Sequence, residues 1–134
     1  MLQKLNTKRG GFTLVEIMIV VAIIALLASI AVPNFLRSRK RSQATMIVED
    51  LRQIDSAMDQ YAIENNKKSG DSVAWADVQK YIKTGTRLYT STGKDVIGND
   101  FTITSVDSAP KVHTSTYDAL SDVAPADFWS PFYP

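Results

Sequence analysis

Few side chains in this sequence are suited to catalysis, and the residue types that are missing exclude most enzymatic sites. The chain has one histidine, His113, and no cysteine, so thiol catalysis, disulfides and cysteine-ligated zinc are excluded. His113 lies in a predicted strand among Thr and Ser residues, where a histidine is far more often a packing or surface residue than a catalyst. No Ser–His–acid spacing, phosphate-binding loop or run of metal ligands is present. We therefore expect no enzymatic activity.

Three acids near the C-terminal end, Asp118, Asp122 and Asp127, are the only candidates for a metal site. Hard cations prefer oxygen ligands, so these carboxylates together with backbone carbonyls would suit Ca²⁺. Their spacing matches no calcium-binding loop, and acids of this kind are more often solvated surface residues. The sequence therefore predicts no bound cofactor, with calcium near these three acids as the alternative.

Glu16 is the only formally charged residue in the apolar segment 12–35, which reads FTLVEIMIVVAIIALLASIAVPNF. A carboxylate in the middle of a bilayer costs at least about 2.5 kcal/mol, so such a group usually has a partner. The alternative is that Glu16, only five residues into the segment, lies near the interface and reaches the lipid head groups. Two roles for Glu16 therefore stay open: it pairs with an opposite charge, or it lies at the membrane interface without a specific role.

The apolar segment is long enough to cross a membrane. Residues 17–32 contain neither a charge nor a proline, and the segment that starts at Phe12 reaches the length of about 20 residues that a helix needs to span the hydrocarbon core. Beyond it, apolar residues recur at helical spacing, at Ala44, Ile47, Val48, Leu51, Ile54, Met58, Tyr61 and Ala62. This pattern predicts one helix over residues 12–64, with Pro33 as a kink rather than a stop. Such a helix would be about 80 Å long. A domain of this size cannot enclose it, so its first half must be buried in lipid or in other chains.

The remainder of the chain predicts a small α+β domain. Residues 65–71 end the long helix, and a short helix follows around residues 74–82. Residues 87–91, 96–97, 101–106 and 112–117 read as short strands separated by turns. We expect a small antiparallel sheet packed, with the short helix, against the second half of the long helix. The terminal aromatics Phe128, Trp129, Phe132 and Tyr133 are expected to pack over this sheet.

Charge is nearly balanced over the whole chain but not along it. Lys plus Arg total 15 and Asp plus Glu total 14, which argues against nucleic acid as a partner. Residues 1–11, MLQKLNTKRGG, carry three cations and no acid. A second cationic cluster, Arg37, Arg39, Lys40 and Arg41, follows the apolar segment. It would bind lipid phosphates at a membrane boundary, or acids such as Glu49 or Asp50 of a neighbouring chain.

The junction KRGGFTLVE resembles the processing site of type IV prepilins and type II secretion pseudopilins, and the resemblance extends from Lys8 to Phe35. It implies that a membrane prepilin peptidase cuts between Gly11 and Phe12 and methylates the new amine of Phe12. Glu16 is then the fifth mature residue, and Pro33 lies 21 residues after Phe12. In related filaments the helix around such a proline is thought to loosen on assembly; the alternative is a merely tolerated kink.

Cleavage would place an ammonium group at Phe12, four residues from Glu16. In a filament, Glu16 of one subunit would neutralise the Phe12 ammonium of its neighbour, and this pairing would set the axial register. A buried pair of this kind is better credited with register than with net stability. Glu16 and Pro33 are therefore the predicted assembly residues.

The resemblance also implies an organisation and a location. Residues 1–11 would be the leader, residues 12–35 the transmembrane and polymerisation half of the helix, and residues 36–134 the amphipathic half plus a small globular domain. The precursor would cross the inner membrane once with its C-terminal domain outside the cytoplasm, then enter a periplasmic or extracellular filament. Partners would be further copies and other pilin-like subunits, the prepilin peptidase and methyltransferase, an inner-membrane assembly platform and membrane lipid.

Three alternatives stay open. A type II secretion pseudopilin is favoured over a type IV pilin, because the chain lacks the cysteines with which many pilins close a C-terminal loop and its globular region is small. An ordinary signal peptide cleaved after Ala31 would release a soluble protein, but Glu16 interrupts its apolar region and that region is longer than usual. A plain single-span membrane protein would keep the cationic cluster in the cytoplasm, opposite to the orientation that the resemblance implies.

Overall fold

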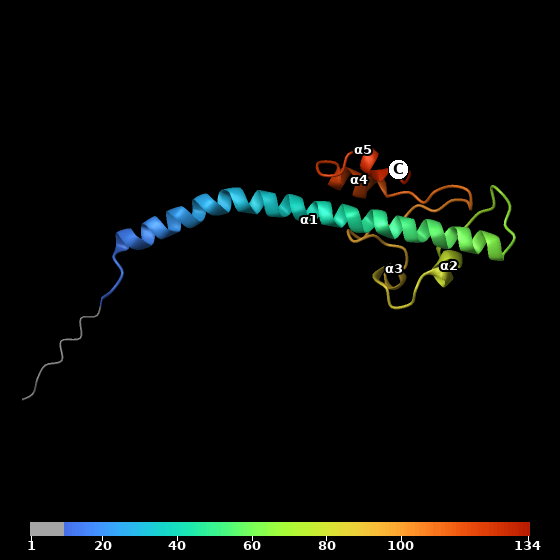
Figure 1. Cartoon of the computed structure of the whole chain (residues 1–134), viewed down its shortest axis with the longest axis horizontal. Helices are drawn as coiled ribbons and strands as arrows, with labels where there is room; N and C mark the ends of the chain where they lie inside the picture. The colour runs from blue at the N-terminus through green and yellow to red at the C-terminus, as the bar shows by residue number, and fades with distance from the viewer. Residues whose placement is uncertain (1–9) are drawn as a thin grey trace, which may run out of the picture. The chain divides into compact units, whose positions relative to one another are not determined.

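The computed structural model describes residues 10–134, so the first nine residues of the predicted leader, with Lys4, Lys8 and Arg9, lie outside the described part. The chain divides into two compact units, Met1–Leu36 and Arg37–Pro134, which are considered separately below. One helix, α1 (Leu14–Glu64), continues through this division and is the long ribbon in Figure 1. The predicted long helix is therefore confirmed, with a start two residues later than expected.

Pro33 lies inside α1, and the helix continues on both sides of it. Proline has no backbone N–H, so the carbonyl of Ser29, four residues earlier, lacks its usual helical donor. The Ser29 hydroxyl donates to the Leu26 carbonyl at 2.6 Å, a separate bond that does not replace the missing one. Pro33 therefore removes one hydrogen bond from α1 without ending it.

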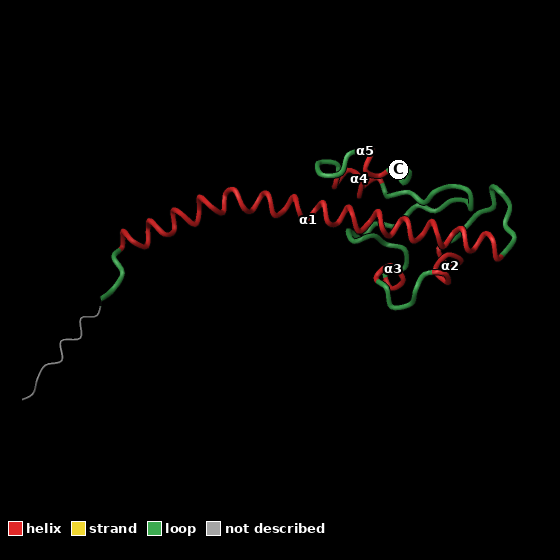
Figure 2. Tube along the Cα trace, in the orientation of Figure 1, coloured by secondary structure: helices red, strands yellow, loops and turns green. Residues whose placement is uncertain are grey.

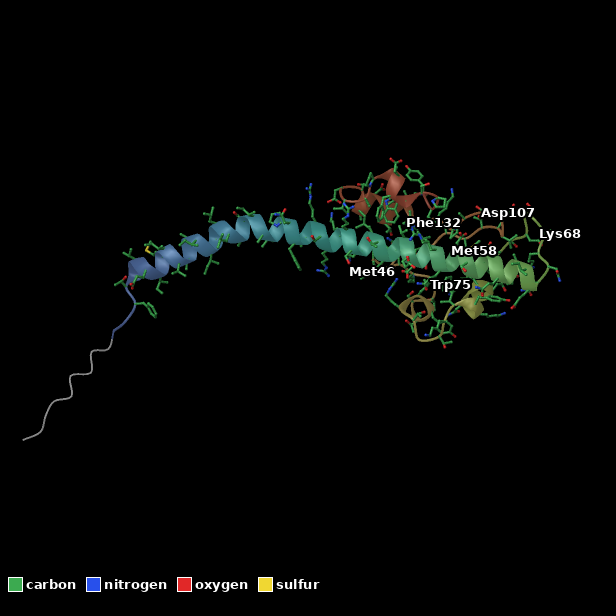
Figure 3. All side chains as sticks on the ribbon, in the orientation of Figure 1. Met46, Met58, Lys68, Trp75, Asp107 and Phe132 are labelled. Atoms are coloured by element: carbon green, nitrogen blue, oxygen red, sulfur yellow. The ribbon has the colours of Figure 1, made fainter. Side chains whose placement is uncertain are left out.

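The core of the second unit is built on one face of α1. The predicted apolar stripe is buried except for Ala62, which is only partly covered, and Ala57 belongs to it as well. Met58 on this face is 1% exposed, whereas Met46 on another face is 51% exposed (Figure 3). The residues that cover the stripe come from the rest of the unit: Val73, Val78, Ile82, Leu88, Phe101, Val112, Leu120, Ala124, Trp129 and Phe132. Each large apolar side chain buried in this way contributes about 1.5–3 kcal/mol.

Short helices and irregular segments make up the rest of the second unit. The helices are α2 (Trp75–Val78), the 3₁₀ turn η1 (Gln79–Tyr81), α3 (Arg87–Thr90), α4 (Thr114–Leu120) and α5 (Ala126–Trp129). The short helix expected around residues 74–82 corresponds to α2 and η1. Of the terminal aromatics, Trp129 and Phe132 are buried, whereas Tyr133 is half exposed.

The predicted antiparallel sheet, and with it the α+β class, is wrong: residues 10–134 contain no strand (Figure 2). The β-type backbone pairing in these residues consists of isolated antiparallel bridges at Ser72–Ser105, Lys94–Asp100 and Thr102–Lys111. Residues 87–90 form α3, and most of residues 112–117 belong to α4. Phe128, Trp129 and Phe132 consequently pack with the stripe of α1 and its covering residues, not over a sheet.

Side-chain capping explains why two of the predicted strands are helices. The Thr86 hydroxyl accepts a hydrogen bond from the Tyr89 N–H at the start of α3. The Nδ1 atom of His113 accepts one from the Ser115 N–H at the start of α4. Such local bonds satisfy backbone groups that a strand would have to pair with a distant segment.

The carboxylates of Asp95 and Asp107 accept hydrogen bonds from loop residues and so hold these loops in place without a sheet. Asp95, which is 5% exposed, accepts hydrogen bonds through Oδ1 from the N–H groups of Ile97, Gly98 and Asn99, and through Oδ2 from the Thr116 hydroxyl. Asp107 accepts from the Ser69 hydroxyl at 2.6 Å and the Gly70 N–H at 2.7 Å. These bonds from Ser69 and Gly70 hold the pKa of the Asp107 carboxyl below its usual value.

The hydrogen bonds that the Asp95 carboxylate accepts, called the Asp95 clamp from here on, should stabilise the second unit. Asp95→Ala leaves the N–H groups of Ile97 and Asn99 and the fully buried Thr116 hydroxyl without an acceptor, whereas the Gly98 N–H keeps its bond to the backbone carbonyl of residue 95. We therefore expect the free energy of unfolding to fall by about 3 kcal/mol. Urea denaturation of a fragment of residues 40–134, which we expect to be soluble, monomeric and folded because the buried stripe begins at Ala44, measures this change. The control is Asp100→Ala, whose exposed ion pair with Lys94 is worth less than about 1 kcal/mol. Equal losses in the two variants would contradict a structural role for the clamp.

Candidate assembly site at the start of the long helix

Thr13 and Glu16 form a reciprocal cap at the start of α1. The Thr13 N–H and Thr13 hydroxyl donate to Oε2 of Glu16 at 2.7 and 3.0 Å, and the Glu16 N–H donates to the Thr13 hydroxyl at 3.2 Å. This arrangement is a capping box, in which two backbone donors that the helix leaves free are satisfied by side chains. The sequence signature, Thr followed three residues later by Glu before an apolar run, was available but the role of Thr13 was not predicted.

The cap fixes where the Glu16 carboxylate lies. Oε2 is held against the backbone nitrogen of Thr13, one residue after Phe12. Among the described residues, every hydrogen bond to this carboxylate goes to Oε2, so the acceptor positions of Oε1 are available. The carboxylate is thus held at the helix start, against the N–H of the residue that follows Phe12, whose own nitrogen would become an ammonium group on cleavage.

The predicted cleavage position is also exposed. Residues 10–13 precede the helix and have no regular secondary structure, and among the described residues nothing beyond the chain neighbours lies within 4 Å of a Cβ placed on Gly10 or Gly11. Phe12 is 86% exposed. The bond between Gly11 and Phe12 is therefore in an open, non-helical stretch.

The first unit exposes apolar side chains around the whole circumference of its helix, from Leu14 to Leu36. An 18-residue window of this helix has a mean hydropathy of 2.9 and no buried residue, and its length and composition suffice to cross a membrane. Isolated soluble proteins rarely expose contiguous apolar patches larger than a few hundred Å². This surface therefore requires lipid or other protein chains around it.

The acids predicted for calcium are not brought together. Asp122 forms an ion pair with Lys40, with 3.1 Å between Oδ2 and Nζ, and Asp118 and Asp127 are exposed. Within residues 10–134 no group of three or more acidic or histidine side chains is placed to hold a metal ion. The prediction of no bound cofactor, with calcium as its alternative, stays a prediction.

Asp50 differs from its predicted role as a surface acid. It is 8% exposed and pairs with Arg87, whose guanidinium also reaches the Lys94 carbonyl at 3.4 Å. The pattern of neighbouring residues along the helix does not show that Asp50 has a partner, because Arg87 lies 37 residues away in the sequence. Glu49 stays accessible in an exposed contact with Arg52, so of the two acids proposed for a neighbouring chain only Glu49 is available.

Two further acids lie on the same helix. Partial burial, with a smaller contribution from the Asp59 carboxylate one turn away, raises the pKa of the Asp55 carboxyl.

The chain is similar to a known family and to several known proteins. The family model described as the prokaryotic N-terminal methylation motif matches residues 6–32. The type II secretion system core protein G of Vibrio cholerae is 35% identical over 101 residues, which cover 70% of this chain and 69% of that protein. The chain belongs to the type IV pilin-like family.

Other members of this family match a shorter part of the chain. The type II secretion system core protein G of Pectobacterium carotovorum is 38% identical over 60 residues, which cover 45% of this chain and 38% of that protein. The type IV wide pilus major component PilA4 of Thermus thermophilus is 41% identical over 64 residues, covering 48% of this chain and 49% of that protein. The chain thus spans less than half the length of these two relatives. No solved structure matches it.

Proposed function

We propose that this chain is a structural subunit of a pilin-like filament, most specifically a type II secretion pseudopilin, and not an enzyme. The observation that carries the proposal is the helix surface of residues 14–36, which is apolar on every side and exposed. A membrane covers such a surface before assembly, and the same surfaces of other subunits cover it in a filament. The match to the N-terminal methylation motif supports the same sequence of events.

The pseudopilin assignment is supported by how much of the chain a relative matches. The match to core protein G of V. cholerae covers 101 residues and 70% of this chain, whereas the match to PilA4 covers 64 residues and 48% of it. Both alignments are too long to lie within the first unit, which ends at Leu36, but the one to core protein G includes more of the second unit. A type IV pilin is the second candidate, because the shorter match to PilA4 has the higher identity, 41%. Imaging of sheared cell-surface filaments distinguishes the two.

In this proposal the precursor crosses the inner membrane once, with the second unit outside the cytoplasm. A prepilin peptidase removes residues 1–11 and methylates Phe12, and an inner-membrane assembly platform adds the subunit to a filament with other pilin-like subunits. The Phe12 ammonium of one subunit then binds Glu16 of a neighbour. The geometry of the cap supports this pairing, since Oε2 is used by Thr13 while Oε1 is available.

Cleavage is the first test. We expect the mature protein to begin at Phe12 with an N-methyl group, because the Gly11–Phe12 bond lies in an exposed, non-helical stretch. Intact-mass measurement of protein from the native host reports the position directly. A mature N-terminus at Val32 would instead establish secretion by an ordinary signal peptide and contradict the proposal.

Glu16 is the second test. Glu16→Ala should insert in the membrane and be cleaved, but should enter filaments poorly because a neighbour's Phe12 ammonium would be buried without a counter-charge. Stranding a buried charge typically costs about 3–5 kcal/mol. Glu16→Gln should fare only slightly better, since it accepts a hydrogen bond but does not neutralise the cation. Immunoblots of membrane and sheared-filament fractions, with each variant as the sole copy, measure the effect.

Thr13→Val is the matched control, because it removes the capping hydroxyl and keeps the Glu16 carboxylate. Loss of a cap costs about 1 kcal/mol, so this variant should retain most of the filament yield. If Thr13→Val lost filaments as severely as Glu16→Ala, the requirement would be for the helix cap. A normal yield from Glu16→Ala would show that the carboxylate has no role in assembly.

A further inference from the structure

The cationic cluster Arg37, Arg39, Lys40 and Arg41 follows directly after Leu36, the last residue of the apolar surface. Its charges are not equivalent. The Lys40 ammonium is paired with Asp122, whereas the ion pairs of the described residues include none for the three arginines. Three guanidinium groups are therefore available to an external anion.

Two of these arginines face a groove. Arg37 and Arg41 line a space of about 190 Å³ together with Asp122 and Val123, which follow α4. Residues four apart lie on the same side of a helix, and at 3.6 residues per turn Arg39 points to the opposite side. With Lys40 and Asp122 paired, the net charge beside the groove comes from Arg37 and Arg41.

The position of these arginines along α1 matches the depth of lipid phosphates. At about 1.5 Å per residue, Arg37 lies about 38 Å and Arg41 about 44 Å along the helix from Phe12. A bilayer has a hydrocarbon core of about 30 Å and a total thickness of about 40–45 Å. If Phe12 lies at one interface, both guanidinium groups reach the head groups of the other. Helical side chains also tilt toward the N-terminus, here toward the membrane.

We propose that the groove between Arg37, Arg41 and Asp122 binds the phosphate of an anionic phospholipid in the membrane that holds the precursor. This inference rests on the proposed function, because it needs α1 to span the bilayer from Phe12. The planar guanidinium group forms paired hydrogen bonds to phosphate oxygens, and two of them on one helix face make a fixed site for one phosphate. The Asp122 carboxylate compensates the Lys40 charge beside the groove and thereby limits the affinity, so that a subunit can leave the lipid when it enters a filament.

The experiment measures lipid selectivity on the full-length chain in a non-ionic detergent. The protein is mixed with equal amounts of phosphatidylglycerol and phosphatidylcholine, and native mass spectrometry gives the ratio of the two lipids retained. We expect the wild type to prefer phosphatidylglycerol. Each cation near an anionic lipid contributes about 1 kcal/mol, so Arg37→Gln with Arg41→Gln should lower the ratio by about tenfold or more. Asp122→Asn should raise it, by up to about fivefold.

The matched control is Arg39→Gln with Arg52→Gln, which removes two exposed arginines of the same helix that do not line the groove. It should lower the ratio by no more than about fivefold, because of these two arginines only Arg39 lies near the lipid head groups. An equal loss in the control would show general charge attraction and overturn the site. So would a wild type without preference, a ratio lowered by Asp122→Asn, or displacement of the lipid by the same concentration of inorganic phosphate.

The measurement of the lipid ratio requires neither cleavage nor filament formation. A result that contradicts the lipid site is therefore distinguishable from one that contradicts the proposed function. Filament yield of the Arg37→Gln, Arg41→Gln variant is scored separately. A reduced yield with an unchanged lipid ratio would show that the groove binds a second copy of the chain, and would overturn the lipid assignment while the filament proposal stands.

Discussion

Apolar side chains cover every side of α1 from Leu14 to Leu36, and exposing that surface to water is unfavourable by roughly 25 cal/mol for each Å². Most of the molecule's organisation follows from this constraint. In the second half of α1 the apolar residues form a single stripe, which the short helices and loops of the same chain cover. This half therefore needs no other chain or lipid to bury its apolar surface. The first half has no polar face to leave in water, so it requires a membrane or an assembly of like subunits.

Glu16 lies at the N-terminal end of that apolar surface, where α1 begins. A helix leaves four N–H groups without partners at its start, and an apolar environment makes them costly. The Thr13–Glu16 cap satisfies backbone donors where α1 begins, and it also holds a carboxylate beside Phe12. One side chain therefore has two roles in this account. It caps the helix start, where the box satisfies two backbone donors, and in the proposed filament it supplies the charge that a neighbouring ammonium needs.

The sequence predicted α1 well because an uninterrupted apolar segment and a stripe at helical period have few alternative structures. The small sheet was mispredicted because Thr-rich segments such as residues 112–117 suit both strands and helix caps, and His113 and Thr86 cap helices here. The burial of Asp50 depends on Arg87, a contact that local spacing does not encode. The Thr13 cap, in contrast, was readable from the sequence, since its partner lies three residues away.

The central claim is that Glu16 of one subunit binds the Phe12 ammonium of another. Filaments assembled from a mixture of subunits labelled with ¹⁵N at Phe12 and subunits labelled with ¹³C at the Glu16 carboxylate test it most directly. In the mixture, any ¹⁵N–¹³C magnetisation transfer between the two sites must cross from one chain to another. Solid-state NMR should detect this transfer at a distance of about 4 Å, as expected for an ion pair. Absence of transfer in the mixed filaments, with transfer present in filaments whose subunits carry both labels, would contradict the account.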